Sequence, residues 1–103
     1  MRRSVVDDLF PVGTVYGIGP DSRETIKVGF TKNPVAWRVR QMQVENDTTL
    51  LLYFSCTGTR RKEDFIRRYL RRRYPDLHLG GDWFVRTPQL MASLRYLGRQ
   101  NHR

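Results

Sequence analysis

Two β-prone segments joined by a turn signal constrain this chain most. The segments are residues 14–19 and 25–30, and residues 19–22 between them read Gly-Pro-Asp-Ser, a strong turn signal. Three apolar residues at alternate positions of the second segment share one face: Ile26, Val28 and Phe30. We therefore expect an antiparallel hairpin, in which Gly17 and Gly29 leave room for another group to approach the backbone.

A helix and a third strand are expected next. Asn33 has the residue type of a helix cap and Pro34 that of a first helical position. An apolar stripe at helical spacing then predicts an amphipathic helix over about 34–44: Val35, Val39 and Met42. The nearly continuous apolar run at 48–56 predicts a strand with both faces largely covered.

Two further helices complete the predicted chain. The second runs from near Thr59 to about Arg73, with Phe65, Ile66, Tyr69 and Leu70 on its buried face. The third is capped by Thr87 and Pro88 and ends at Gly98, with four residues facing inward: Leu90, Met91, Leu94 and Leu97.

These elements predict one α+β domain over residues 1–103, with a core at about 13–97 and a basic tail at 99–103. The expected fold is a three-stranded antiparallel sheet flanked by helices, in the order β-β-α-β-α-α. A chain of 103 residues suits a single domain of this kind.

The charge of the chain points to a polyanionic partner. Nineteen Lys and Arg against ten Asp and Glu give a formal net charge of +9, which favours binding to nucleic acid. No apolar run approaches the roughly 20 residues of a membrane span, and no secretory segment is visible, so we expect a cytoplasmic protein. Cys56 is the single cysteine, which excludes a disulfide scaffold and a zinc site of several cysteines, and we expect it in the core.

Basic residues concentrate in the second predicted helix. Residues 60–73 hold eight of them against Glu63 and Asp64: Arg60, Arg61, Lys62, Arg67, Arg68, Arg71, Arg72 and Arg73. The sign is too one-sided for a lattice of ion pairs along the helix. Arg68, Arg71 and Arg72, on the face away from the apolar residues, predict a stripe that follows phosphates.

Several short motifs occur in a fixed order along these elements. They are Tyr16 within Val15-Tyr16-Gly17-Ile18, Lys27-Val28-Gly29, Thr31-x-Asn33-Pro34, Arg38 within Arg38-Val39-Arg40-Gln41, Glu63 in the second predicted helix, and Gly81-Asp82-Trp83-Phe84. In this order the motifs resemble the GIY-YIG endonuclease superfamily. They are most similar to its small phage and bacterial branch, of the meiotically up-regulated gene type, whose second motif reads K-I-G. The chain departs from that pattern at three positions, with Thr14 for glycine, Arg67 for histidine and Asp82 for glutamate.

The resemblance implies metal-dependent hydrolysis of a nucleic-acid phosphodiester at a single site. It gives Tyr16 a part in activating the attacking water and Arg38 the stabilisation of the phosphate. It gives Glu63 the binding of one divalent cation, Mg²⁺ or Mn²⁺. Lys27 takes the place of the second tyrosine of the family.

General chemistry is consistent with these roles. The unperturbed pKa of tyrosine is about 10, so Tyr16 can act as a base near neutral pH only if nearby positive charge lowers its pKa. Lys27 and Arg38 are the residues that would supply this charge. A single carboxylate suits Mg²⁺, which keeps several waters and binds oxygens of the phosphate.

Three functions remain open from the sequence. The first is a small stand-alone nuclease acting on DNA, and the second is a non-catalytic nucleic-acid-binding module on the same fold. The third is a basic structural protein associated with RNA. Specificity for particular DNA sites would then come from DNA shape, a partner protein or a homodimer.

The expected nucleic-acid-binding residues are Arg40, Arg60, Arg61, Lys62, Arg67, Arg68, Arg71 and Arg72. Tyr16 and Trp83 also have a plain interpretation as packing aromatics.

Overall fold

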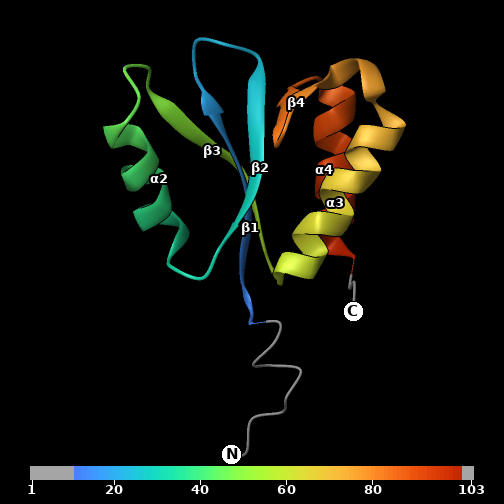
Figure 1. The fold of residues 1–103 in the computed structure, drawn as a ribbon, viewed down its shortest axis with the longest axis horizontal. Helices are drawn as coiled ribbons and strands as arrows, with labels where there is room; N and C mark the ends of the chain where they lie inside the picture. The colour runs from blue at the N-terminus through green and yellow to red at the C-terminus, as the bar shows by residue number, and fades with distance from the viewer. Residues whose placement is uncertain (1–10, 101–103) are drawn as a thin grey trace, which may run out of the picture.

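The computed structural model describes residues 11–100, which form three α-helices, one 3-10 turn and five strands. In chain order these are β1 (Gly13–Pro20), β2 (Thr25–Thr31), α2 (Val35–Val44), β3 (Leu50–Gly58), α3 (Arg60–Arg73), η1 (Pro75–Leu77), β4 (His78–Gly80), β5 (Trp83–Val85) and α4 (Pro88–Arg99). Helix α2 covers one face of the sheet, and helices α3 and α4 cover the other (Figure 1).

The sheet is antiparallel, with the strand order β3-β1-β2-β5-β4. The fold is α+β, but the prediction of three strands in the order β-β-α-β-α-α is wrong, because β4 and β5 lie between the second and third helices. Each has only three residues, too few for an alternating pattern to be visible. They pair because the first half of β2 offers a free edge: Thr25, Ile26 and Lys27 lie opposite Val85, Phe84 and Trp83.

The register of the β1–β2 hairpin sorts its residues between two cores. Tyr16 lies opposite Gly29, and Ile18 opposite Lys27. Because neighbouring residues of a strand point to opposite faces, Val15 enters the core beneath α3 and α4, whereas Tyr16 and Ile18 enter the core beneath α2.

The larger core lies between the sheet and helices α3 and α4. The three alternating residues of β2 all belong to it, as predicted, with Phe30 at its margin: Ile26, Val28 and Phe30. The inward-facing residues predicted for the third helix are buried there too: Leu90, Met91, Leu94 and Leu97. The smaller core holds Tyr16, Ile18, Met42 and Leu50, with Val35 and Val39 packed against it, so the apolar stripe of α2 is confirmed.

Helix ends agree with the sequence where a side-chain cap exists. The Thr87 hydroxyl accepts a hydrogen bond from the Leu90 N–H, as expected for the predicted cap of α4. The Thr59 hydroxyl likewise accepts from the Lys62 N–H, at the position near which α3 was predicted to begin. The cap predicted at Asn33 is wrong: its backbone N–H donates to the Thr31 hydroxyl, and α2 begins after Pro34 with no side-chain cap. The predicted end of the third helix at Gly98 is wrong, because α4 continues to Arg99. Gly98 instead leaves room for the Phe54 ring, which a Cβ at this position would meet.

Two burial predictions are also wrong. Leu51 and Leu52 are each 42% exposed, because β3 is an edge strand and not a covered central one. Phe65 is equally exposed, whereas Ile66 and Leu70 of the same helix are fully buried.

Arg99, placed in a basic tail by the sequence, is the last residue of α4, and residues 101–103 of that tail lie outside the described part. Within residues 11–100, no helix is long and apolar enough to cross a membrane.

Candidate functional site

Tyr16 is held in the sheet beneath α2, with 2% of its surface exposed. Its ring lies over Gly29 on the neighbouring strand, where any Cβ would meet the phenol ring. This close approach explains why β2 carries a glycine at this position. The tyrosine is therefore a packing residue of the smaller core, and the hydrogen bond that its hydroxyl accepts is partly buried.

Arg38 of α2 reaches this hydroxyl. Its Nε donates a hydrogen bond to the Tyr16 hydroxyl at 3.3 Å, across 22 residues of sequence. Its Nη1 donates to Gln41 Oε1 at 2.6 Å, which fixes the guanidinium from within the helix. A guanidinium fixed in this way presents a defined positive charge beside the phenol oxygen.

Lys27 lies on the same face of the sheet as Tyr16. It sits two residues before Gly29 on β2, opposite Ile18 on one side and Trp83 on the other. Lys27 and Tyr16 are thus diagonal neighbours, a relation that places side chains about 7–8 Å apart in an antiparallel pair. The structure therefore brings three of the four predicted catalytic residues to the α2 face of the sheet: Tyr16, Lys27 and Arg38.

Glu63 lies on the other side of the sheet, in the first turn of α3, with 4% of its surface exposed. Its Oε1 forms an ion pair with Arg67 Nε at 2.8 Å. Its Oε2 is buried and has no hydrogen-bond partner among the described residues. Burial raises the pKa of this carboxyl; the charge of Arg67 opposes the rise, and the charge of Asp82 adds to it.

Arg67 joins Glu63 to Asp82. Its Nη1 donates to Asp82 Oδ1 at 2.5 Å, and its Nη2 lies 3.6 Å from Asp64 Oδ1. Asp82 is brought here by the backbone, because its carbonyl accepts a hydrogen bond from the Val28 N–H of β2. Two of the three departures from the family pattern, Arg67 and Asp82, are thus partners in one ion pair.

A hollow links the two sides of the sheet at the end of β2. Arg38 from α2 and Arg60 from α3 both line it. Arg60 lies one turn before Glu63, and its guanidinium stands 5.1 Å from the centroid of the Phe30 ring. The hollow therefore connects the Tyr16–Arg38 pair with the beginning of the helix that carries Glu63.

The predicted nucleic-acid-binding residues separate into two groups. Lys62 is buried and donates to the carbonyl oxygens of Thr57 and Gly98, and Arg67 is held by carboxylates. The charges of these two residues are used inside the protein, so neither is expected to contact phosphate. The others stay on or near the surface, although Arg68 also forms an ion pair with Asp64 at 3.0 Å: Arg40, Arg60, Arg61, Arg68, Arg71 and Arg72. Arg68, Arg71 and Arg72 line a shallow hollow on α3, as expected for neighbours at helical spacing.

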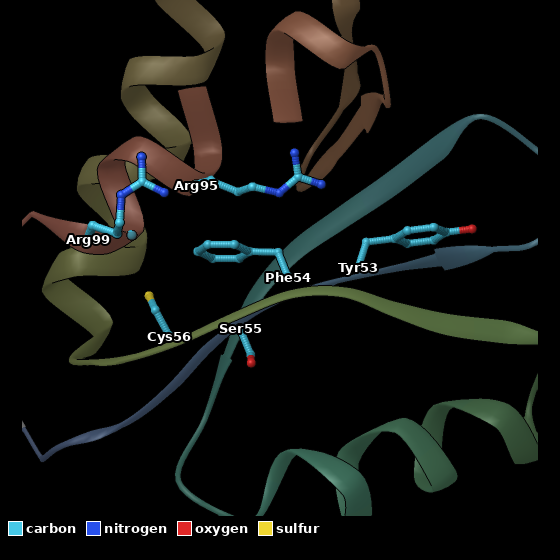
Figure 2. Close-up of a pocket in the computed structure, with 7 residues that line it drawn as sticks. Tyr53, Phe54, Ser55, Cys56, Arg95 and Arg99 are labelled. Carbon is cyan, nitrogen blue, oxygen red and sulfur yellow. The ribbon is translucent and has the colours of Figure 1, made fainter. Parts of the chain in front are cut away.

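A further hollow lies between β3 and α4, and Figure 2 shows Arg95 and Arg99 of α4 on one side of it and Phe54 and Cys56 of β3 on the other. Arg95 was not singled out from the sequence, because its helix was judged only by its apolar face, and Arg99 was placed in the basic tail beyond that helix. Cys56, predicted to lie in the core, is half-buried and packs against the larger core from its margin. Burial raises the pKa of its thiol, and Lys62 opposes the rise. A thiol with a raised pKa is a poor nucleophile.

No family model, curated protein or solved structure matches this chain. The GIY-YIG resemblance therefore rests on the motif residues of the sequence alone. Within residues 11–100, no group of three or more His, Cys, Asp or Glu could hold a metal ion.

Proposed function

We propose that this protein is a small cytoplasmic nuclease of the GIY-YIG kind, which hydrolyses DNA phosphodiesters with one divalent metal ion. The hydrogen bond from Arg38 Nε to the Tyr16 hydroxyl is the main support. It joins the two residues to which the resemblance gives water activation and phosphate stabilisation. Lys27, on the same face, supplies a second positive charge.

The roles follow from what each group can do near a phosphate. Arg38 and Lys27 place positive charge on the face of the sheet that carries the Tyr16 hydroxyl, and this hydroxyl would take part in activating the attacking water. The same guanidinium stabilises the negative charge that grows on the non-bridging oxygens. Arg38 also lines the hollow at the end of β2, so a phosphate seated there would contact it directly.

Glu63 is the residue that would hold the metal ion. Its Oε2 is buried without a partner among the described residues, and a carboxylate oxygen of this kind is a suitable ligand for Mg²⁺ or Mn²⁺. A bound cation would supply positive charge to the phosphate and to the departing oxygen. Glu63 Oε1 already forms an ion pair with Arg67, so only Oε2 would be available to the metal ion as a ligand.

The alternative is a non-catalytic nucleic-acid-binding module, and one observation favours it. Arg67 ties Glu63 to Asp82, so a fixed cation already stands among the carboxylates. In this alternative, Glu63 is a structural partner of Arg67 and only the exposed arginines serve the nucleic acid. A partner protein or a homodimer would provide specificity in either case.

A cleavage assay with Mg²⁺ or Mn²⁺ on supercoiled, linear and branched DNA tests the proposal. We expect the parent protein to cut and Glu63→Gln to lose the activity, because the amide oxygen is a much weaker ligand for the cation. Binding of DNA by Glu63→Gln should be unchanged or slightly tighter, since a negative charge near phosphate is removed. Equal cutting by the variant would show that Glu63 is not the metal ligand.

Arg67→His separates the two candidate functions. If the chain is a binding module disarmed by Arg67, the parent should not cut with either metal, and the histidine variant should gain metal-dependent cleavage. If the parent is already a nuclease, the substitution should change its rate without creating the activity. Circular dichroism on the variant checks that removal of the Asp82 ion pair leaves the fold intact.

A further inference from the structure

The hollow at the end of β2 combines an aromatic surface with positive charge. It has a volume of about 360 Å³ and is lined by residues that include Phe30, Lys32, Asn33, Trp37, Arg38 and Arg60. No aspartate or glutamate is among its described lining residues. A cavity of this size with cations and no carboxylate suits an anionic ligand.

Trp37 is the feature of the hollow that the fold does not explain. It lies in the first turn of α2 but off the apolar stripe that packs on the sheet, and 46% of its surface is exposed. Its indole therefore contributes little to either core. Tryptophan offers a large flat surface with few rotatable bonds, so it can stack on a planar ligand at a small cost in entropy.

Cations surround this surface on several sides. Arg38 is fixed by its hydrogen bonds to Tyr16 and Gln41. Arg60 approaches from α3 with its guanidinium over the Phe30 ring, an arrangement that restrains the side chain. Lys32 adds a third positive charge from the loop after β2. Phosphate groups on either side of a stacked base would meet these three cations.

We propose that the hollow binds one unpaired nucleotide, with its base stacked on Trp37 and its phosphates on Arg38 and Arg60. A paired base is enclosed between its neighbours in a duplex and cannot lie on an indole without being extruded. Stacking on exposed aromatic residues inside a basic groove is the usual means by which proteins hold single-stranded nucleic acid. The hollow would therefore select single-stranded or branched substrates. The inference rests on the proposed function only in sharing Arg38, because the stacking itself requires binding and not cleavage.

The test measures binding of a single-stranded oligothymidylate and of a matched duplex to the parent protein, Trp37→Leu, Trp37→Phe and Tyr96→Leu, without metal. Tyr96 is an exposed aromatic residue of α4, so its variant is a matched control. We expect Trp37→Leu to weaken single-strand binding roughly 5- to 150-fold, the usual range when one stacking aromatic is removed. Trp37→Phe should weaken it less, and duplex binding and the Tyr96→Leu variant should stay within about twofold of the parent.

Tryptophan fluorescence gives a second readout. The chain has two tryptophans, Trp37 and Trp83. The oligonucleotide should quench the emission of Trp83→Phe, which keeps Trp37, and should leave the emission of Trp37→Leu unchanged. Unaltered single-strand binding by Trp37→Leu, an equal loss on duplex, no binding to any oligonucleotide, or quenching that persists without Trp37 would each overturn the inference. If Trp37 is needed for single-strand binding but the protein does not cut DNA, only the proposed nuclease activity is rejected. If the protein cuts DNA but Trp37→Leu binds single strands normally, only the proposed stacking is rejected.

Discussion

Tyr16→Phe is expected to lower the rate of DNA cleavage by about 10²–10⁴-fold, the usual contribution of general-base help. The variant keeps the buried ring over Gly29 and removes only the hydroxyl that accepts the Arg38 hydrogen bond. Stability should therefore change little, because the ring makes the packing contacts. The loss should appear in the rate at saturating DNA, since the affinity for the substrate does not depend on the phenol oxygen.

Single-turnover cleavage by parent and variant, with thermal unfolding of both, is the required measurement. Tyr53→Phe is the matched control, because it removes a hydroxyl that donates to the Pro20 carbonyl away from Arg38. That control should cut at the parent rate. A Tyr16→Phe protein as active as the parent would leave the phenol without a catalytic role, and the hydrogen bond to Arg38 would then be structural.

The second large effect concerns salt and the outer face of α3. Replacing Arg68, Arg71 and Arg72 together by glutamine should flatten the dependence of log affinity on log salt by roughly 2.7 units, about 0.9 for each phosphate that is no longer neutralised. With affinities that agree at 1 M salt, this corresponds at about 50 mM salt to a complex weaker by roughly 3,000-fold. Glutamine keeps the helix propensity and much of the length of the side chain, so the fold of α3 should persist.

Binding to duplex DNA over a range of salt concentrations measures the slope. The matched control is the Arg95→Gln, Arg99→Gln double variant, which lowers the net charge on α4 and leaves the α3 face untouched. Its slope should stay close to that of the parent. If the triple variant has the parent slope, this face of α3 does not contact DNA; if the α4 variant shows the same flattening, total charge and not position sets the affinity.

Local patterns predicted the parts of this fold that depend on local chemistry. Helices α3 and α4 begin where Thr59 and Thr87 can cap them, because a cap and a helical repeat are both contained in one short segment. Strand order is a property of the whole chain. The sequence therefore could not show that β3 is an edge strand, or that β4 and β5 extend the sheet from three strands to five.

The candidate site, like the fold, could be predicted from the sequence only in part. Tyr16, Lys27 and Arg38 could be chosen from their motifs. The register of one hairpin brings Tyr16 and Lys27 to one face, and α2 carries Arg38 over that face. The pairing of Arg67 with Asp82 could not be foreseen, because 15 residues separate them and each was considered alone as a departure from a motif. Trp37 was missed for a simpler reason, since a tryptophan within an amphipathic helix is normally taken as part of its packing face.

The two strands that pair with β2 lie at very different distances from it along the sequence. It meets β1 through a tight turn, whereas β5 arrives from more than fifty residues away, after two helices and two further strands. Closing a short loop costs less entropy than closing a long one, so the hairpin should form early and the β2–β5 pairing late. Tyr16 would then rest on Gly29 before Asp82 is in place to meet Arg67. The two halves of the candidate site would thus assemble at separate stages of folding.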